Sequence, residues 1–82
     1  MLKRQCLVIE EIYVPVKRRQ TLNLAKVATL AESVLEEGQK APILVRADEK
    51  RFVLIEGLHR LEACKALGET TISAYLVQAR QH

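Results

Sequence analysis

One stretch, residues 55–63, limits the possible folds of this chain more than any other, because a glycine turn there separates a strand pattern from a helix pattern. Residues 52–55 form an apolar run with β-branched members, which is typical of a buried strand. After Gly57, apolar side chains recur every three residues and mark one face of a short helix that Gly68 would end: Leu58, Leu61, Cys64 and Leu67. The pattern therefore predicts a strand, a turn and a helix in direct succession.

A turn of this kind is suited to binding an anion. The first turn of a helix leaves backbone N–H groups unpaired and carries the positive end of the helix dipole. Gly57 lets the backbone approach a ligand closely, Arg60 can donate two parallel hydrogen bonds to phosphate oxygens, and His59 adds a further donor. The alternative is an ordinary connection in which His59 and Arg60 face water, and spacing alone does not decide between the two.

The remaining patterns predict the order β-α-β-β-α-β. The predicted strands cover residues 7–9 with 12–14, residues 43–45, residues 52–55 and residues 72–77, and a polar turn at 47–50 joins the middle two as an antiparallel hairpin. A long helix is expected from a cap at Thr21 or Asn23 to about Glu37, with Gly38 as its stop. This order on 82 residues predicts one compact α+β domain over residues 1–82, with a small mixed sheet and two main helices on one face.

The long predicted helix carries two stripes of side chains. One stripe is apolar and is expected to be buried: Leu24, Val27, Leu30, Ala31 and Val34. On an adjoining face, Lys26, Thr29 and Ser33 follow one another at helical spacing and form a polar stripe. Either this polar stripe is an ordinary solvent-facing surface or it belongs to a binding site.

The charge of the chain favours anionic ligands. Its formal net charge is +3, and the dense interior basic cluster is Lys17, Arg18 and Arg19, which we expect in a loop. The cluster is either a solvated loop or a contact surface for the phosphates of a nucleotide or of DNA. Aromatic residues make up 4% of the chain, which argues against a general binder of single-stranded nucleic acid.

The cysteines and the apolar runs of the sequence lead to predictions about metal binding and localisation. Two cysteines cannot form a metal cluster, so no metal site is predicted; Cys64 is expected in the core and Cys6 to be partly exposed. No apolar run approaches the roughly 20 residues that span a membrane, and the first residues lack the pattern of a secretory signal. We therefore expect a cytoplasmic protein without a membrane partner.

Three blocks of the sequence, covering about residues 7–77, resemble the ParB/sulfiredoxin superfamily. They are residues 12–19, residues 25–33 with 38–43, and residues 56–68. The last block, EGLHRLEACKALG, is the most specific of the three. The resemblance implies a ParB/sulfiredoxin-like domain.

The sulfiredoxin branch implies a nucleotide site. In sulfiredoxins the turn reads Gly-Cys-His-Arg; its His and Arg hold ATP phosphates and its Cys performs the redox chemistry. Leu58 stands at the position of that Cys, so the resemblance implies nucleotide binding without sulfinic-acid reductase activity. A Lys and two hydroxyl residues on the first helix also bind nucleotide in that branch, and they match Lys26, Thr29 and Ser33.

The ParB branch implies a role with DNA. Its domain binds CTP, clamps on DNA and is followed by a helical module that reads the plasmid or chromosome partition site. The present sequence ends soon after its last predicted strand, so we do not expect a self-sufficient partition protein. A further branch phosphorylates free serine and has an acidic residue before the turn, as Glu56 precedes Gly57 here.

Three functions follow as hypotheses. The first is a nucleotide-binding domain that holds the phosphates of ATP or CTP, with phosphoanhydride hydrolysis or phosphoryl transfer and Mg²⁺ as further candidates. Its site would comprise Lys26, Thr29, Ser33, Gly57, Leu58, His59 and Arg60, with Glu56 and His59 as candidate catalytic residues. The second is a DNA-binding module, or a nuclease, that uses Lys17, Arg18 and Arg19 with Arg60 to contact phosphates. The third is a domain that only contacts a partner protein or a second copy of itself.

Overall fold

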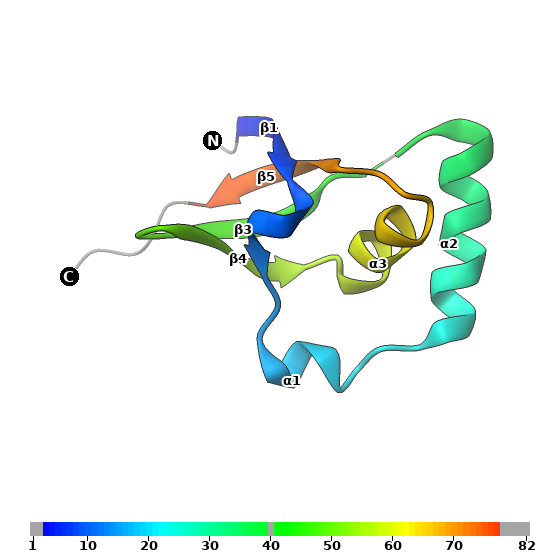
Figure 1. Ribbon diagram of the computed structural model, residues 1–82, viewed down its shortest axis with the longest axis horizontal. Helices are drawn as coiled ribbons and strands as arrows, with labels where there is room; N and C mark the ends of the chain where they lie inside the picture. The colour runs from blue at the N-terminus through cyan, green and yellow to red at the C-terminus, as the bar shows by residue number, and fades with distance from the viewer. Residues whose placement is uncertain (1–2, 40, 78–82) are drawn as a thin grey trace.

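The computed structural model describes residues 3–39 and 41–77, which form a five-stranded mixed sheet and three α-helices (Figure 1). The strands are β1 (Lys3–Val8), β2 (Ile12–Tyr13), β3 (Ile43–Asp48), β4 (Arg51–Glu56) and β5 (Thr71–Val77). The helices are α1 (Val16–Arg19), α2 (Leu24–Glu37) and α3 (Leu58–Ala66), and a single 3₁₀ turn at Ile9–Glu11 joins β1 to β2. The predicted α+β fold is confirmed.

The pairing of the strands explains why distant segments meet. The sheet has the order β1-β5-β3-β4-β2, and the predicted antiparallel hairpin of β3 and β4 is confirmed, with Asp48 opposite Arg51 beside the turn. At the edge of the sheet, β2 and β4 run parallel. Parallel neighbours end at the same side of a sheet. The segment that follows β2, which is α1, therefore lies beside the turn that follows β4 at Gly57.

The helices form successive layers on the sheet. Figure 1 shows α3 between the strands and α2, so α3 covers the sheet and α2 packs on the outer side of α3. Leu58, Leu61 and Cys64 are buried as predicted, whereas Leu67 is half-buried because the helix has already ended at Ala66. These three buried residues of α3 form one core with residues from all five strands and from the segments on either side of β2: Leu7, Ile9, Ile12, Val14, Ile43, Val45, Leu54, Leu58, Leu61, Cys64, Ile72 and Ala74.

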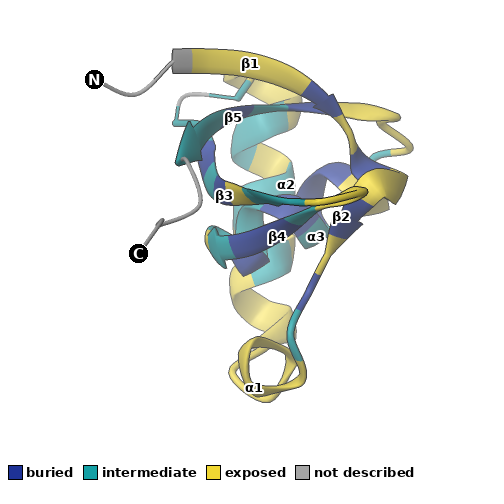
Figure 2. Cartoon of the chain, turned by 90° about the vertical axis from the view of Figure 1, so that its left-hand side faces the viewer, coloured by how far each residue is buried: buried dark blue, intermediate teal, exposed yellow. Residues whose placement is uncertain are grey.

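The predicted apolar stripe on α2 is only partly buried. Leu24 is 75% exposed, and Val27, Leu30, Ala31 and Val34 are only partly buried. The reason is the layering, because α2 packs mainly against one short helix, α3, and Val34 is the residue of the stripe that also packs against the core. Figure 2 shows α2 in the colours of exposed and intermediate residues. Helical periodicity reports that one face is apolar, but it does not report how large a surface will cover that face.

Two smaller predictions also need correction. The basic residues Lys17, Arg18 and Arg19 lie in the short helix α1, which starts directly after Pro15, and not in a loop. A helix of four residues is too short to produce a periodic pattern that a sequence would reveal. Cys6 is exposed on the edge strand β1, where we expected partial exposure just before the first strand.

Gln39 ties the end of α2 to β5. Its side-chain Nε2 donates to the carbonyl oxygens of Ala41 and Ser73, both at 3.0 Å, and its Oε1 accepts from the Ser73 N–H at 2.9 Å. We expect Gln39→Ala to lower the free energy of unfolding by about 2 kcal/mol, because three partly buried hydrogen bonds are lost at about 1 kcal/mol each, with partial recovery from water. Chemical denaturation measures the difference.

The matched control for this change is Gln20→Ala, because Gln20 has an exposed side chain at the end of α1. An exposed substitution of this kind changes stability by no more than about 0.5 kcal/mol. Equal stability of the two variants would contradict the structural role given to Gln39.

None of the helices in the described part of the chain is long and apolar enough to cross a membrane.

Candidate functional site

The turn between β4 and α3 has the geometry that the sequence predicts. Gly57 is the N-cap of α3 and adopts a left-handed conformation with φ of 107°. The first hydrogen bond inside the helix runs from the Leu61 N–H to the Gly57 carbonyl oxygen at 2.9 Å. A glycine has no side chain that could cap the N–H groups before Leu61, so they point along the helix axis toward any ligand at this end.

Arg60 lies in the same first turn and carries an unsatisfied donor. Its Nε atom is buried and has no hydrogen-bond partner among the described residues. A buried polar N–H without an acceptor is costly, and native proteins rarely retain one without a reason. Arg60 does not line any of the three cavities described in this section, and its charge acts on the buried thiol of Cys64. A contact between Arg60 and a bound anion therefore stays a prediction.

Two cavities meet at His59. The first, here called the turn cavity, has a volume of about 290 Å³ and is lined by residues from α1, the end of β4 and the Gly57 turn, among them Arg18, Glu56, Gly57, Leu58 and His59. The second, here called the helix cavity, has a volume of about 450 Å³ and is lined by Asn23, Ala25, Lys26, Thr29, Leu30 and His59. His59 thus borders both cavities and joins the two halves of the predicted site.

A hydrogen bond fixes His59 in this position. The backbone N–H of Asn23 donates to Nε2 of His59 at 3.0 Å, and so connects the start of α2 with the first turn of α3. The Nε2 lone pair is therefore occupied, and the ring can act neither as a proton acceptor nor as a donor at that nitrogen while the bond holds. Nδ1 remains as the ring nitrogen that can bind a ligand.

The polar stripe on α2 is only partly brought into the site. Lys26 and Thr29 line the helix cavity beside His59, whereas Ser33 lies one turn further along the helix and does not line it. The Thr29 hydroxyl donates to the carbonyl oxygen of Ala25 at 3.1 Å, so a phosphate would have to replace that bond to receive its proton. The involvement of these three residues in binding stays a prediction.

The three basic side chains of α1 lie in different surroundings. Arg18 lines the turn cavity together with Gly57 and His59. Arg19 lines another, larger cavity, and Lys17 is exposed and lines none of the three cavities named in this section. The three side chains therefore do not line one common cavity, although they are adjacent in the sequence.

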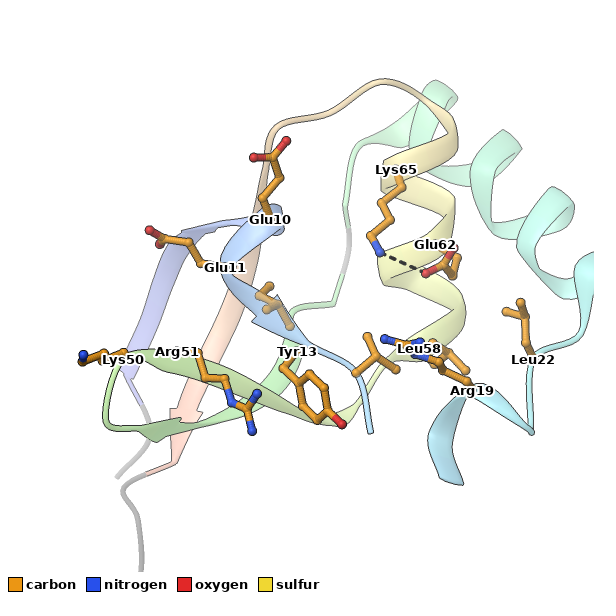
Figure 3. A pocket seen from close by; sticks show the side chains of 12 residues that line it. Glu10, Glu11, Tyr13, Arg19, Leu22, Lys50, Arg51, Leu58, Glu62 and Lys65 are labelled. Atoms are coloured by element: carbon orange, nitrogen blue, oxygen red, sulfur yellow. Dashed lines mark hydrogen bonds and ion pairs between the residues drawn. The ribbon is translucent and has the colours of Figure 1, made fainter. Parts of the chain in front are cut away.

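The larger cavity, here called the side cavity, measures about 670 Å³ and lies on the other side of Leu58 (Figure 3). Figure 3 shows Tyr13, Arg19 and Leu58 among the side chains that line it, and the Glu62–Lys65 pair, 3.3 Å apart, on α3. The lining mixes carboxylates with cations and contains neither Gly57 nor His59. Although it is larger, we expect it to bind phosphate less well than the turn cavity, because three carboxylates line it and Gly57 does not.

Glu56 is the acidic residue that lines the turn cavity, and its side chain is exposed. No group of three or more His, Cys, Asp or Glu side chains in residues 3–39 and 41–77 is arranged to hold a metal ion. Any Mg²⁺ at this turn would therefore depend on oxygens of a bound phosphate in addition to Glu56.

Cys64 is buried behind this turn, on α3. Burial raises the pKa of its thiol, the charge of Glu69 raises it further, and Arg60 opposes the shift. Because the folded thiol keeps its proton more firmly than the unfolded one, this contribution to stability is complete below the ordinary value of 9.0 and is lost as the pH rises through the folded pKa.

We expect the two thiols to differ strongly in reactivity. At pH 8 a disulfide reagent such as Ellman's should modify the exposed Cys6 rapidly, and Cys64 only at the rate at which the fold opens. The colour change should correspond to one fast thiol in the native chain, none in Cys6→Ser and two after denaturation. Two fast thiols in the native chain would contradict the placement of Cys64.

Asn23 was predicted only as a helix cap and not as a residue of the site. Its contact with His59 joins residues 36 positions apart, and no sequence pattern reports such a pair. The sequence also does not show that Arg18 and Arg19 line different cavities, because the directions of their side chains depend on α1 being a helix. The preference for Asn at the N-cap of a helix was the one sequence signal for Asn23, and it indicates only the capping role.

The mixed sheet, the layered helices and the glycine turn define an α+β domain of the ParB/sulfiredoxin-like class. Residues 3–82 match the model of the ParB N-terminal domain, so the chain belongs to the ParB N-terminal domain family. A curated relative, the probable chromosome-partitioning protein ParB of Campylobacter jejuni, is 37% identical over 62 residues, which are 76% of this chain and 22% of the relative. The chain therefore spans about a fifth of the length of that relative.

Two solved structures illustrate the range of the class. Sulfiredoxin from Arabidopsis thaliana superposes with a TM-score of 0.85 and 28% identity, over 94% of this chain and 86% of that one. The C-terminally truncated chromosome-partitioning protein ParB from Caulobacter crescentus, complexed with CTP-γ-S, superposes with a TM-score of 0.81 and 23% identity, over 96% of this chain and 46% of that one.

Proposed function

We propose that this domain binds a nucleoside triphosphate, ATP or CTP, with the phosphates at the turn formed by Gly57, Leu58, His59 and Arg60. The observation that carries the proposal is the uncapped first turn of α3 at the turn cavity, which Arg18, Gly57 and His59 line together. Phosphate oxygens would satisfy both Arg60 and the free N–H groups, and the helix dipole adds to the attraction.

The surroundings of the turn support a triphosphate better than a single small anion. Arg18 approaches the turn cavity from α1, and Lys26 borders the adjoining helix cavity. A chain of phosphates could therefore extend from the turn past His59 toward α2, with the sugar and base at the helix cavity. The Caulobacter crescentus ParB structure, which has the same fold, is a complex with CTP-γ-S.

Hydrolysis or phosphoryl transfer is a further part of the proposal. Glu56 is the candidate proton acceptor or ligand of a phosphate-bound Mg²⁺, because it is the acid that borders the turn cavity. His59 would act through Nδ1, since Nε2 is already bonded to Asn23. Sulfinic-acid reductase activity is not part of the proposal, because Leu58 offers no thiol and Cys64 is buried.

Calorimetric titration tests the proposal. One sample is titrated with ATP, CTP, ADP and a short DNA duplex, each with and without Mg²⁺, and release of inorganic phosphate is followed in parallel. We expect a triphosphate to bind more tightly than the duplex. Binding of the duplex together with no binding of any nucleotide would overturn the proposal.

A DNA-binding module is the second candidate, and the three basic residues of α1 carry it, since all are exposed. Contacts of this kind give affinity without sequence preference, and each neutralised phosphate adds close to one unit to the logarithmic salt slope. Plasmid or chromosome partition would then require DNA binding through this surface, and a nuclease would need catalytic groups in addition.

Lys17 and Arg18 distinguish the two candidates, because one lies outside the turn cavity and the other lines it. If the domain is a nucleotide binder, Arg18→Ala should weaken triphosphate binding about five- to tenfold, and Lys17→Ala should leave it within twofold. Equal losses of duplex affinity in both variants, with unchanged triphosphate affinity, would favour the DNA-binding candidate. Affinities measured at several salt concentrations decide between these results.

A further inference from the structure

Asn23 makes two kinds of contact across the site. Its backbone N–H donates to Nε2 of His59 at 3.0 Å. Its side-chain Oδ1 accepts from the N–H groups of Ala25 at 2.9 Å and Lys26 at 3.3 Å, and so caps α2. One residue therefore holds the first turn of α2 and the imidazole ring on α3 in a fixed relation.

The contact with His59 decides where the ring carries its proton. A backbone N–H can only donate, so Nε2 must be the acceptor nitrogen and the proton of the neutral ring lies on Nδ1. A neutral imidazole that is free in water prefers the opposite arrangement, with the proton on Nε2. The protein thus imposes the less common tautomer on His59.

This arrangement matters because His59 borders both the turn cavity and the helix cavity. Phosphate oxygens are acceptors, so a ring nitrogen that meets them must carry a proton. With Nε2 occupied by Asn23, a proton on Nδ1 provides such a donor without any need to charge the ring.

We propose that Asn23 is a positioning residue of the nucleotide site, which selects the Nδ1–H tautomer of His59 and makes Nδ1–H the ring donor to phosphate. This inference rests on the proposed function. The same contact aligns the start of α2, which carries Lys26, with the Gly57 turn. No covalent bond changes, because the role of Asn23 is to orient and not to react.

The tautomer is measured first, without nucleotide. Long-range ¹H–¹⁵N correlation spectra at pH 8, recorded on His82→Gln so that a single imidazole remains, report which ring nitrogen of His59 carries the proton. We expect Nδ1 to be protonated and Nε2 to be the acceptor. A ring with its proton on Nε2, or with the averaged signals of a free imidazole, would overturn the inference.

Variants then connect the tautomer with binding. Asn23→Ala removes the cap and loosens the start of α2, so we expect the ring to drift toward the Nε2–H tautomer and triphosphate affinity to fall about five- to tenfold. Asn23→Ser restores a neutral cap and should recover most of that loss in both measurements. Thermal unfolding of each variant verifies that the compared samples are folded.

Two substitutions of His59 separate its two nitrogens. Gln places an amide near the position of Nε2 and leaves none near Nδ1, whereas Asn does the reverse. If Nδ1–H is the phosphate donor, His59→Asn should bind a triphosphate at least threefold more tightly than His59→Gln. Equal affinities, or the reverse order, would overturn the inference.

The outcomes for this inference and for the proposed function are distinct. If the native chain binds no triphosphate, the proposed function fails, and the assignment of Asn23 as a positioning residue fails with it. If the native chain binds triphosphate but the affinity of Asn23→Ala is unchanged, only the assignment of Asn23 fails.

Discussion

Replacing Arg60 by alanine is expected to weaken triphosphate binding about 10- to 100-fold while the chain stays folded. Arg60 is half-buried, its Nε has no acceptor in the described structure, and it lies in the first turn of α3. Loss of a charge-assisted hydrogen bond to phosphate costs about 1.5–3 kcal/mol, which corresponds to this range of affinity. Calorimetric titration of the variant measures the change.

Arg60→Lys is the matched control for this variant. It keeps a positive charge but lacks the Nε donor and the planar fork of the guanidinium group, so its affinity should lie between those of the native chain and of Arg60→Ala. Circular dichroism and thermal unfolding establish that each variant is folded. A folded Arg60→Ala with native affinity would remove Arg60 from the site.

Replacing Gly57 by alanine is expected to destabilise the fold by about 2–5 kcal/mol. An added Cβ would lie 2.6 Å from Cγ2 and 2.9 Å from Cβ of Ile43, which is almost fully buried in the centre of the sheet. The φ of 107° adds strain of about 1–3 kcal/mol for a residue with a side chain, and the overpacking adds a similar amount. Chemical denaturation measures the sum.

Gly68→Ala separates the two causes. Gly68 also has a positive φ, of 80°, but an added Cβ there would meet no atom within 4 Å. This control therefore carries the backbone strain without the collision, and its cost should be about 1 kcal/mol. If both variants lost the same stability, the contact with Ile43 would not be the reason for a glycine at position 57.

The glycine turn illustrates what the sequence reveals. The strand before it, the helix after it and the antiparallel hairpin were predictable, because alternation and helical spacing report local structure directly. We expected a glycine at position 57 because it lets a ligand approach the backbone. The structure adds a second reason, since a Cβ at this position would collide with Ile43. The sequence does not distinguish these two reasons, because Ile43 and Gly57 come together only in the sheet.

The rest of the site depends on long-range contacts that local patterns do not encode. Leu24 was predicted to be buried and is exposed, since α2 packs mainly against one short helix. Arg18 and Arg19 looked equivalent but border different cavities. The bond from Asn23 to His59 depends on the layering of α2 on α3, which the order of the elements alone does not determine.

Amide chemical shifts test whether a triphosphate binds at the Gly57 turn. We expect ¹H–¹⁵N spectra recorded during titration with ATP or CTP, in the presence of Mg²⁺, to show the largest shifts at the amides of residues 57–60, with smaller shifts at the start of α2. Native spectra without shifts up to millimolar triphosphate, or shifts confined to the side cavity around Tyr13 and Lys65, would contradict the account.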